Sequence, residues 1–228
     1  MLVINSLSSG RVHHFGQSIL DAHRDKIRTF EAAARIWVQC IYDALVDENQ
    51  SRVFALVRIF RISSYTQLPP DLQAQVNQQD DQWLTLVATQ GDQPAWCNRQ
   101  LSQSHRCIPR TSAHESPMLT AVFNQLDLFW KLEQDNPGLP LKTLSRHVTR
   151  YFHVPEALGS PYIVAQEDFV KPYQIRSVIG LGSQFVSGSP AILIGFSKAP
   201  INEQAAQIFA ELAPYVFTLL SNKNTGWD

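Results

Sequence analysis

QIRSVIGLGSQFVSGSPAILIGFS, residues 174–197, is the stretch of the sequence that decides the fold. It contains two apolar runs, 174–186 and 190–197, joined by Ser187-Gly188-Ser189. Short apolar runs bounded by turn residues predict β-strands, and a three-residue connection containing Gly predicts a β-hairpin. We therefore expect an antiparallel sheet in the last third of the chain.

Three further stretches predict strands of the same sheet. Residues 52–63 (RVFALVRIFRIS) are apolar on both alternating faces, and such a strand is covered on both sides. Residues 83–89 (WLTLVAT) end at a Gly91-Asp92 turn signal, and residues 151–154 form a shorter candidate strand. The polar stretch 92–117 between them is expected to be rich in loops.

Two long helices are predicted near the ends of the chain. The first runs from about Arg28 to Asp47, and if it begins as early as Gln17 it protrudes and pairs with a second copy. The second follows Asn202, a residue type that caps helices, and reaches Leu220. Shorter helical segments are expected at 117–126, with a continuation over 127–133, and at 142–149 as a helix or turn.

This element order predicts an α+β fold with a central antiparallel sheet. The N- and C-terminal helices are expected on one face, and loops with a short helix are expected to cover a pocket on the other face. We expect residues 25–222 to form one domain, with an N-terminal extension over 1–24 and a C-terminal tail over 223–228.

The composition excludes several classes of protein. The chain has 228 residues, 44% of them hydrophobic and 17% charged, and 19 basic against 20 acidic side chains give a formal net charge of −1. This balance argues against nucleic acid or a membrane as a partner. No apolar run reaches the roughly 18 residues of a membrane span, and the start lacks the order of a signal peptide. We expect a cytoplasmic protein.

Three cysteines, Cys40, Cys97 and Cys107, are too few for a disulfide framework and are expected to be free thiols. Cys97, His105 and Cys107 do not have the close Cys pairs of a zinc site, so no metal is expected. No catalytic arrangement of serine, histidine and acidic residues is visible, and no phosphate-binding glycine loop.

The segment YFHVPEALGSPYIVAQEDFVKPYQIRSVIGLGSQFVSGSPAILIGFSKAPI, residues 151–201, resembles a GAF-type sensor segment of bacterial multidomain signalling proteins. An earlier stretch, AWCNRQLSQSHRCIP (95–109), is similar to the Trp-Asn-Asp-Arg and Gly-His-x-Ile-Pro segment of the same group. The resemblance covers about residues 25–221. The chain departs from the group at Cys97 and at Gln103-Ser104-His105, and shows neither the cyclic-nucleotide pattern nor the tetrapyrrole-binding Cys-His pair.

The resemblance implies a non-enzymatic sensory or regulatory module that binds an unidentified small molecule and acts in signal transduction. It further implies a homodimer formed through the terminal helices and a signalling partner such as a histidine kinase. The resemblance does not identify a cofactor, which stays unknown. Two alternatives stay open. One is a GAF-fold redox enzyme of the free methionine sulfoxide reductase type, with Cys97 and Cys107 as its thiols. The other is a dimerisation or interaction module without a ligand.

Six residues are candidates for the ligand pocket, each with a structural alternative. An arginine in an apolar strand needs a partner, which would be either a ligand or an acidic side chain. Histidines and tyrosines offer polar contacts to a ligand, but they also pack in cores and shape turns. The six candidates are Arg58, Trp96, His105, His153, Tyr162 and Arg176.

Overall fold

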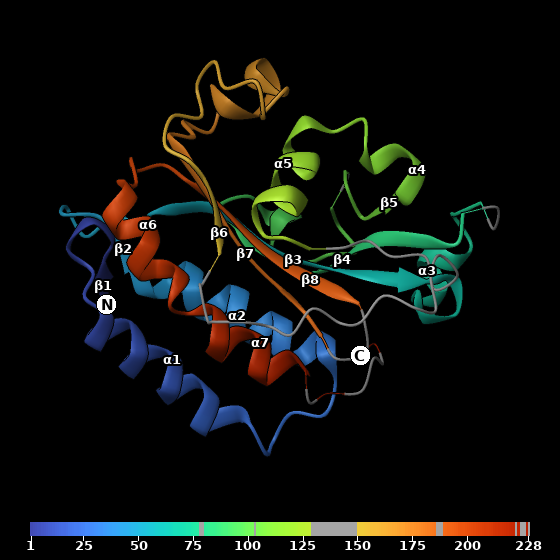
Figure 1. The fold of residues 1–228 in the computed structure, drawn as a ribbon, viewed down its shortest axis with the longest axis horizontal. Helices are drawn as coiled ribbons and strands as arrows, with labels where there is room; N and C mark the ends of the chain where they lie inside the picture. The colour runs from blue at the N-terminus through green and yellow to red at the C-terminus, as the bar shows by residue number, and fades with distance from the viewer. Residues whose placement is uncertain are drawn as a thin grey trace.

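The computed structural model describes residues 1–77, 80–102, 104–128, 150–185, 189–221, 223 and 227. Their fold has three layers, with a twisted sheet in the middle (Figure 1). The strands are β1 (Leu2–Val3), β2 (Leu45–Val46), β3 (Phe54–Ser64), β4 (Gln82–Gly91), β5 (Cys107–Pro109), β6 (Tyr151–Val154), β7 (Ser177–Gln184) and β8 (Pro190–Ser197). The helices are α1 (Ser9–His23), α2 (Phe30–Ala44), α3 (Pro70–Gln73), α4 (Arg110–Ala113), α5 (Pro117–Gln125), α6 (Glu203–Ala210) and α7 (Ala213–Ser221).

The main sheet has six antiparallel strands in the order β5-β4-β3-β8-β7-β6. β3 and β4 are the two longest strands, and the predicted pairing of β7 with β8 is present. β7 begins at Ser177, three residues later than the sequence predicted. The α+β class with a central antiparallel sheet is therefore confirmed.

One face of the sheet is covered by helices, as predicted. α2, α6 and α7 lie against the strands, and α1 lies outside them (Figure 1). Thr29 begins α2 because its side chain accepts a hydrogen bond from Ala32 N at 3.2 Å. This cap separates α2 from α1, so the alternative of one helix starting at Gln17 is wrong. α2 is a core helix with Trp37 fully buried.

The predicted C-terminal helix is two helices, α6 and α7. Asn202 caps α6 by accepting from Ala205 N at 2.8 Å, which confirms that start. The division falls just before Pro214, which has no backbone N–H and whose ring would clash with the carbonyl of the preceding turn in a continuous helix. A proline is tolerated in the first turn of α7, so the chain restarts there.

The first residues, expected to be an extension, form β1 and α1 and pack onto the rest of the fold. β1 pairs with β2, and His13 Nδ1 on α1 lies 2.8 Å from the Tyr215 hydroxyl on α7. Gly16 faces the same tyrosine, and a Cβ there would come within 2.5 Å of its ring. The exposed face of α1 is polar, which explains why its apolar periodicity is weak in the sequence.

The other face of the sheet is covered by α5 and the chain between β6 and β7 (Figure 1). A second apolar cluster fills the space between them and the sheet, with side chains from β3, β4, β7 and β8. The predicted segment 142–149, most of 127–133 and the turn at Ser187-Gly188 lie outside the described residues.

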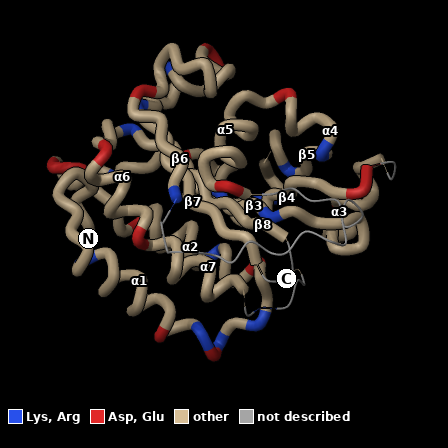
Figure 2. Tube along the Cα trace, viewed as in Figure 1, with Lys and Arg blue, Asp and Glu red and all other residues tan. Residues whose placement is uncertain are grey.

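Acidic and basic residues are interspersed along the described trace (Figure 2). This agrees with a formal net charge near zero. In the part of the chain that the structure describes, no helix is long and apolar enough to cross a membrane.

Candidate functional site

Arg58 is a buried cation on the loop-covered face of the sheet. It lies on β3 between Leu56 and Phe60, which belong to the apolar cluster of that face, and only 6% of it is exposed. The register places Thr89 of β4 directly opposite it on one side and Ile194 of β8 on the other. A charged side chain at the centre of an apolar surface is costly unless it is paired.

The hydrogen bonding of Arg58 is incomplete among the described residues. One terminal nitrogen donates to Ser102 Oγ at 3.1 Å, while Nε is buried without a hydrogen-bond partner. Thr89 Oγ1 is also buried and unpartnered. No carboxylate within the described ranges forms an ion pair with this guanidinium. Burial lowers the pKa of Arg58 to about 10, so the group is still charged at neutral pH.

The described residues of the loop 97–106, which are 97–102 and 104–106, lie over this arginine at the edge of the sheet. Ser102 Oγ, which accepts from Arg58, donates in turn to Ser104 O at 2.9 Å. His105 has a φ of 60°, a left-handed conformation that is uncommon outside glycine. The residue is exposed as a whole, but desolvation of its imidazole and the charge of Arg58 both lower its pKa. Arg58 and Ser102 therefore form one cluster with Thr89, which lies opposite Arg58, and His105 is near enough for the charge of Arg58 to lower its pKa.

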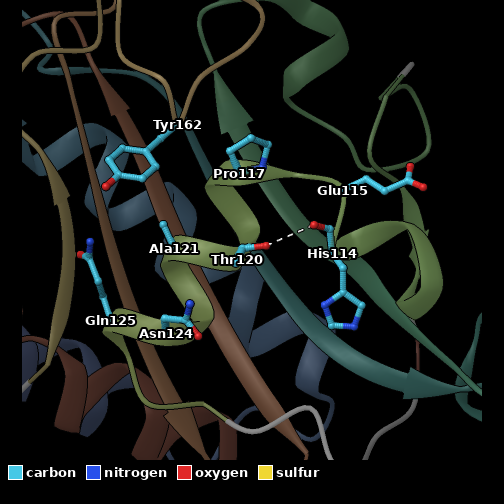
Figure 3. Close-up of a pocket in the computed structure, with 8 residues that line it drawn as sticks. All are labelled: His114, Glu115, Pro117, Thr120, Ala121, Asn124, Gln125 and Tyr162. Carbon is cyan, nitrogen blue, oxygen red and sulfur yellow. Dashed lines mark hydrogen bonds between the residues drawn. The ribbon is translucent and has the colours of Figure 1, made fainter.

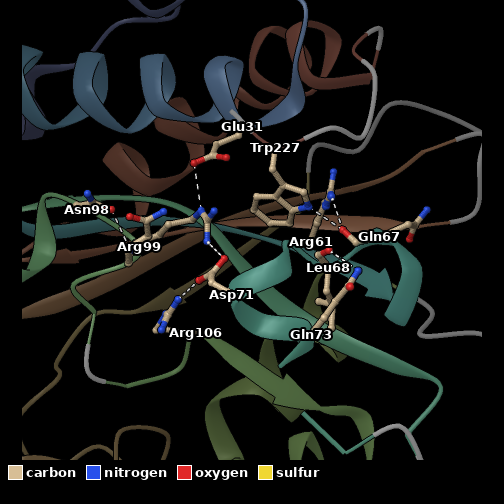
Figure 4. A network of polar contacts seen from close by, with 11 residues as sticks. Glu31, Arg61, Gln67, Leu68, Asp71, Gln73, Asn98, Arg99, Arg106 and Trp227 are labelled. Atoms are coloured by element: carbon tan, nitrogen blue, oxygen red, sulfur yellow. Dashed lines mark hydrogen bonds and ion pairs between the residues drawn. The ribbon is translucent and has the colours of Figure 1, made fainter. Parts of the chain in front are cut away.

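On the helix-covered face of the sheet, salt bridges hold the same loop (Figure 4). Arg99 is 6% exposed and donates through Nε to Glu31 Oε1 on α2 at 3.1 Å. Asp71 on α3 pairs with Arg99 and with Arg106. The loop thus wraps around the edge of β4, with Arg99 on the helix-covered face and Ser102 on the face of Arg58.

An aromatic group lies further along the same face of the sheet. The ring of Trp96 has its centroid 4.5 Å from that of Tyr173 and 5.8 Å from that of Phe169. Trp96 also lies against Gly91, and Gly91 pairs with Leu56. Leu56 is two residues before Arg58 on β3, so the two side chains are neighbours on the same face of the strand. Two residues of strand span about 7 Å, so Arg58 lies beside the aromatic wall formed by Trp96, Phe169 and Tyr173 on the same face of the sheet.

The other three predicted residues lie elsewhere, so the six candidates do not surround a single cavity. His153 is on the helix-covered face, with Nδ1 3.1 Å from Glu203 Oε2 and Nε2 3.0 Å from Ile201 O. Its side chain is 4% exposed and has partners at both nitrogens, which fits its structural alternative. Arg176 is exposed, just before β7.

Tyr162 borders an open hollow of about 490 Å³ formed by described residues. Its other walls come from the turn of His114 and Glu115 and from α5 (Figure 3). Thr120 Oγ1 donates to His114 O at 3.4 Å across this turn. The hollow shares no residue with the cluster around Arg58, and its lining includes neither a buried cation nor a buried polar residue.

The geometry of the cysteines does not favour a redox pair. Cys97 Sγ lies 3.3 Å from Gly91 O, whereas Cys107 pairs through its backbone with Thr85. Thr85 and Gly91 are six residues apart on β4, a span of about 20 Å. A disulfide needs Cα atoms within about 7 Å of each other. Burial raises the pKa of Cys107 to about 12, so its thiol is unreactive at neutral pH.

Among the described residues, no group of three or more His, Cys, Asp and Glu side chains is arranged to hold a metal ion. Thr89 and Ser102, two central residues of the cluster, were not singled out in the sequence. Their position depends on strand register and on the path of the loop, and a hydroxyl residue in a strand or loop gives no local signal of either.

The fold is GAF-like. The chain is similar to the structure of a free methionine-R-sulfoxide reductase from Neisseria meningitidis in complex with its substrate, with 12% identity and a TM-score of 0.54 over 96% of this chain and 95% of that one. It is similar to the GAF domain of a phosphoenolpyruvate-protein phosphotransferase from Coxiella burnetii, with 11% identity and a TM-score of 0.51 over 93% and 94%. At these identities the likeness shows the fold alone. No protein-family model matches the chain, and no curated protein matches it.

Proposed function

We propose that this chain is a non-enzymatic sensory or regulatory module that binds a small anionic molecule at Arg58. The observation that carries the proposal is the buried guanidinium, 6% exposed, whose Nε has no partner among the described residues. An uncompensated buried cation costs folding free energy, and a bound anion supplies the missing charge and the missing acceptor.

The ligand chemistry that fits best is a carboxylate on a small organic molecule. A guanidinium presents Nε and a terminal nitrogen in one plane, which matches the two oxygens of a carboxylate. Thr89 Oγ1, opposite Arg58 and unpartnered, supplies a further donor. The aromatic wall of Trp96 and Tyr173 gives the rest of the molecule an apolar surface.

Binding at this site requires the loop 97–106 to move. Arg58 is buried beneath the contact with Ser102, so an anion reaches Nε only when that part of the loop gives way. The ligand would then favour one loop arrangement over another, which is a population shift that a partner protein can detect. A signalling partner such as a histidine kinase is consistent with this mechanism.

The redox-enzyme alternative has less support. It needs an attacking thiolate within reach of a resolving thiol, and the strand register separates Cys97 from Cys107. The interaction-module alternative rested on a long protruding first helix, but α2 is a core helix. A homodimer through the terminal helices would have to use the polar outer face of α1, since α1 packs on α7.

Thermal denaturation with a series of small mono- and dicarboxylic acids tests the proposal. Each acid is compared with its amide at equal ionic strength, in the wild type and in Arg58→Met. We expect at least one acid to raise the wild-type Tm by about 5 °C at about 100 times its Kd, with no effect of its amide and none on the variant. Equal shifts in both proteins, or no shift with any acid, would overturn the assignment of Arg58.

A further inference from the structure

Trp227, which follows α7 in the chain, packs between two buried arginines, Arg61 and Arg99 (Figure 4). This pair of arginines is called the socket of Trp227. The ring of Trp227 lies 4.6 Å from the guanidinium carbon of Arg61 and 4.6 Å from that of Arg99. Trp227 Nε1 donates to Gln67 O at 2.7 Å, and Arg61 donates to the same oxygen at 3.2 Å. One indole therefore contacts two cations and shares an acceptor with one of them.

The two arginines are 5% and 6% exposed, so these contacts are made away from water. Cation–π interactions are strongest when the cation is desolvated and the ring is an indole. Burial lowers the pKa of Arg61 to about 10, with Glu31 raising it and the nearby positive charge of Arg99 lowering it. The negative face of an indole ring suits such a pair of cations.

Arg99 links this socket to the loop that covers Arg58. It belongs to loop 97–106, and Ser102 N donates to Arg99 O at 3.3 Å. Three residues beyond Arg99, the side chain of Ser102 accepts from Arg58 on the opposite face of the sheet. A contact that fixes the Arg99 side chain therefore also restrains the segment that must move to expose Arg58.

We propose that Trp227 is a latch: by docking between Arg61 and Arg99 it holds loop 97–106 closed, and its release lets the loop open. The proposed latch depends only on the contacts of Trp227 with Arg61 and Arg99, and these contacts involve no ligand. Its effect on ligand admission rests on the proposed function. Because coupling between two sites is reciprocal, ligand binding under the loop would also release Trp227.

Hydrogen–deuterium exchange of the full chain tests the latch. The variants are Trp227→Ala, Trp227→Phe and the control Lys223→Ala, which removes a contact between the same segment and Arg24 O but keeps the indole. We expect Trp227→Ala to speed exchange in peptides covering 97–106 about tenfold, equivalent to about 1.4 kcal/mol. Trp227→Phe keeps an aromatic face without the bond to Gln67 and is expected to have a smaller effect.

Unchanged exchange in 97–106 for Trp227→Ala would overturn the latch. Equal increases in Trp227→Ala and Lys223→Ala would also overturn it, since they would mean a general loosening of the segment after α7. If Trp227→Ala does not fold, no difference between Trp227→Phe and wild type is the contradicting result. The ligand is tested separately with the series of mono- and dicarboxylic acids: faster exchange in Trp227→Ala while none of these acids binds the wild type keeps the latch and rejects the proposed function.

Discussion

Arg58 on β3 and Thr89 on β4 lie directly opposite each other, and each has a buried polar atom without a hydrogen-bond partner among the described residues. Most buried polar atoms in proteins have a hydrogen-bond partner. Two buried atoms without one, at positions that face each other across two strands, therefore need an explanation. The proposed anion would account for both, because it would accept from the guanidinium Nε and from the threonine hydroxyl.

The first prediction concerns stability. Arg58→Met removes an unpaired buried charge, so we expect the free energy of unfolding of the ligand-free protein to stay the same or rise by about 1 kcal/mol. Arg99→Met is the matched control, because it removes the buried cation that donates to Glu31 Oε1, and it is expected to cost about 3 kcal/mol. Chemical denaturation measures both. A large loss in Arg58→Met would mean that this arginine is a structural group.

The second prediction concerns protonation. The positive charge of Arg58 contributes to the lowered pKa of His105, after desolvation. Removing that charge in Arg58→Met is therefore expected to raise the pKa of His105 and extend its charged form to higher pH. An NMR titration of the imidazole resonances measures the shift, with exposed His14 as internal reference. An unchanged His105 titration would show that the two groups are not in electrostatic contact.

The third prediction concerns the thiols. Cys97 is exposed, whereas burial raises the pKa of Cys107 to about 12 and also raises that of Cys40. We expect iodoacetamide at pH 8 to modify Cys97 first, and mild oxidation to form no bond between Cys97 and Cys107. Peptide mass spectrometry locates the modified residue. A Cys97–Cys107 disulfide in the native protein would revive the redox-enzyme alternative.

The fourth prediction separates a structural histidine from a ligand contact. His153→Ala leaves Ile201 O and Glu203 without their imidazole partner, and an unsatisfied buried acceptor costs about 1–3 kcal/mol. We expect lower stability with unchanged binding of any retained molecule. His14→Ala on the exposed face of α1 is the control and should change neither property. Lost binding at normal stability would place His153 in the ligand site.

Much of the fold follows from local patterns in the sequence. β3, β4 and β8 are long apolar runs, and the caps Thr29 and Asn202 begin their helices as predicted. α1 was missed because its buried stripe is narrow and its other residues are polar. The division between α6 and α7 was missed because the apolar stripe continues across it, although Pro214 gave the signal.

The candidate site was only partly predictable. Arg58 stands out because a charge in an apolar strand violates the pattern around it, and His105 because it lies in a polar loop. Thr89 joins the site through strand register and Ser102 through the path of a loop around the sheet edge. Contacts between residues far apart in the sequence produce no periodic pattern, so these positions could not be predicted. The same holds for the packing of Trp227 on Arg61 and Arg99.

Native mass spectrometry of gently purified protein, compared with its denatured mass, tests the central claim most directly. The account predicts that wild-type chains carry a small retained molecule with an acidic group and that Arg58→Met, prepared in parallel, carries none. The same adduct on both proteins would place the ligand elsewhere. Wild-type protein of bare chain mass, still without an adduct after incubation with the carboxylate series, would contradict the claim that this fold binds a small anion at Arg58.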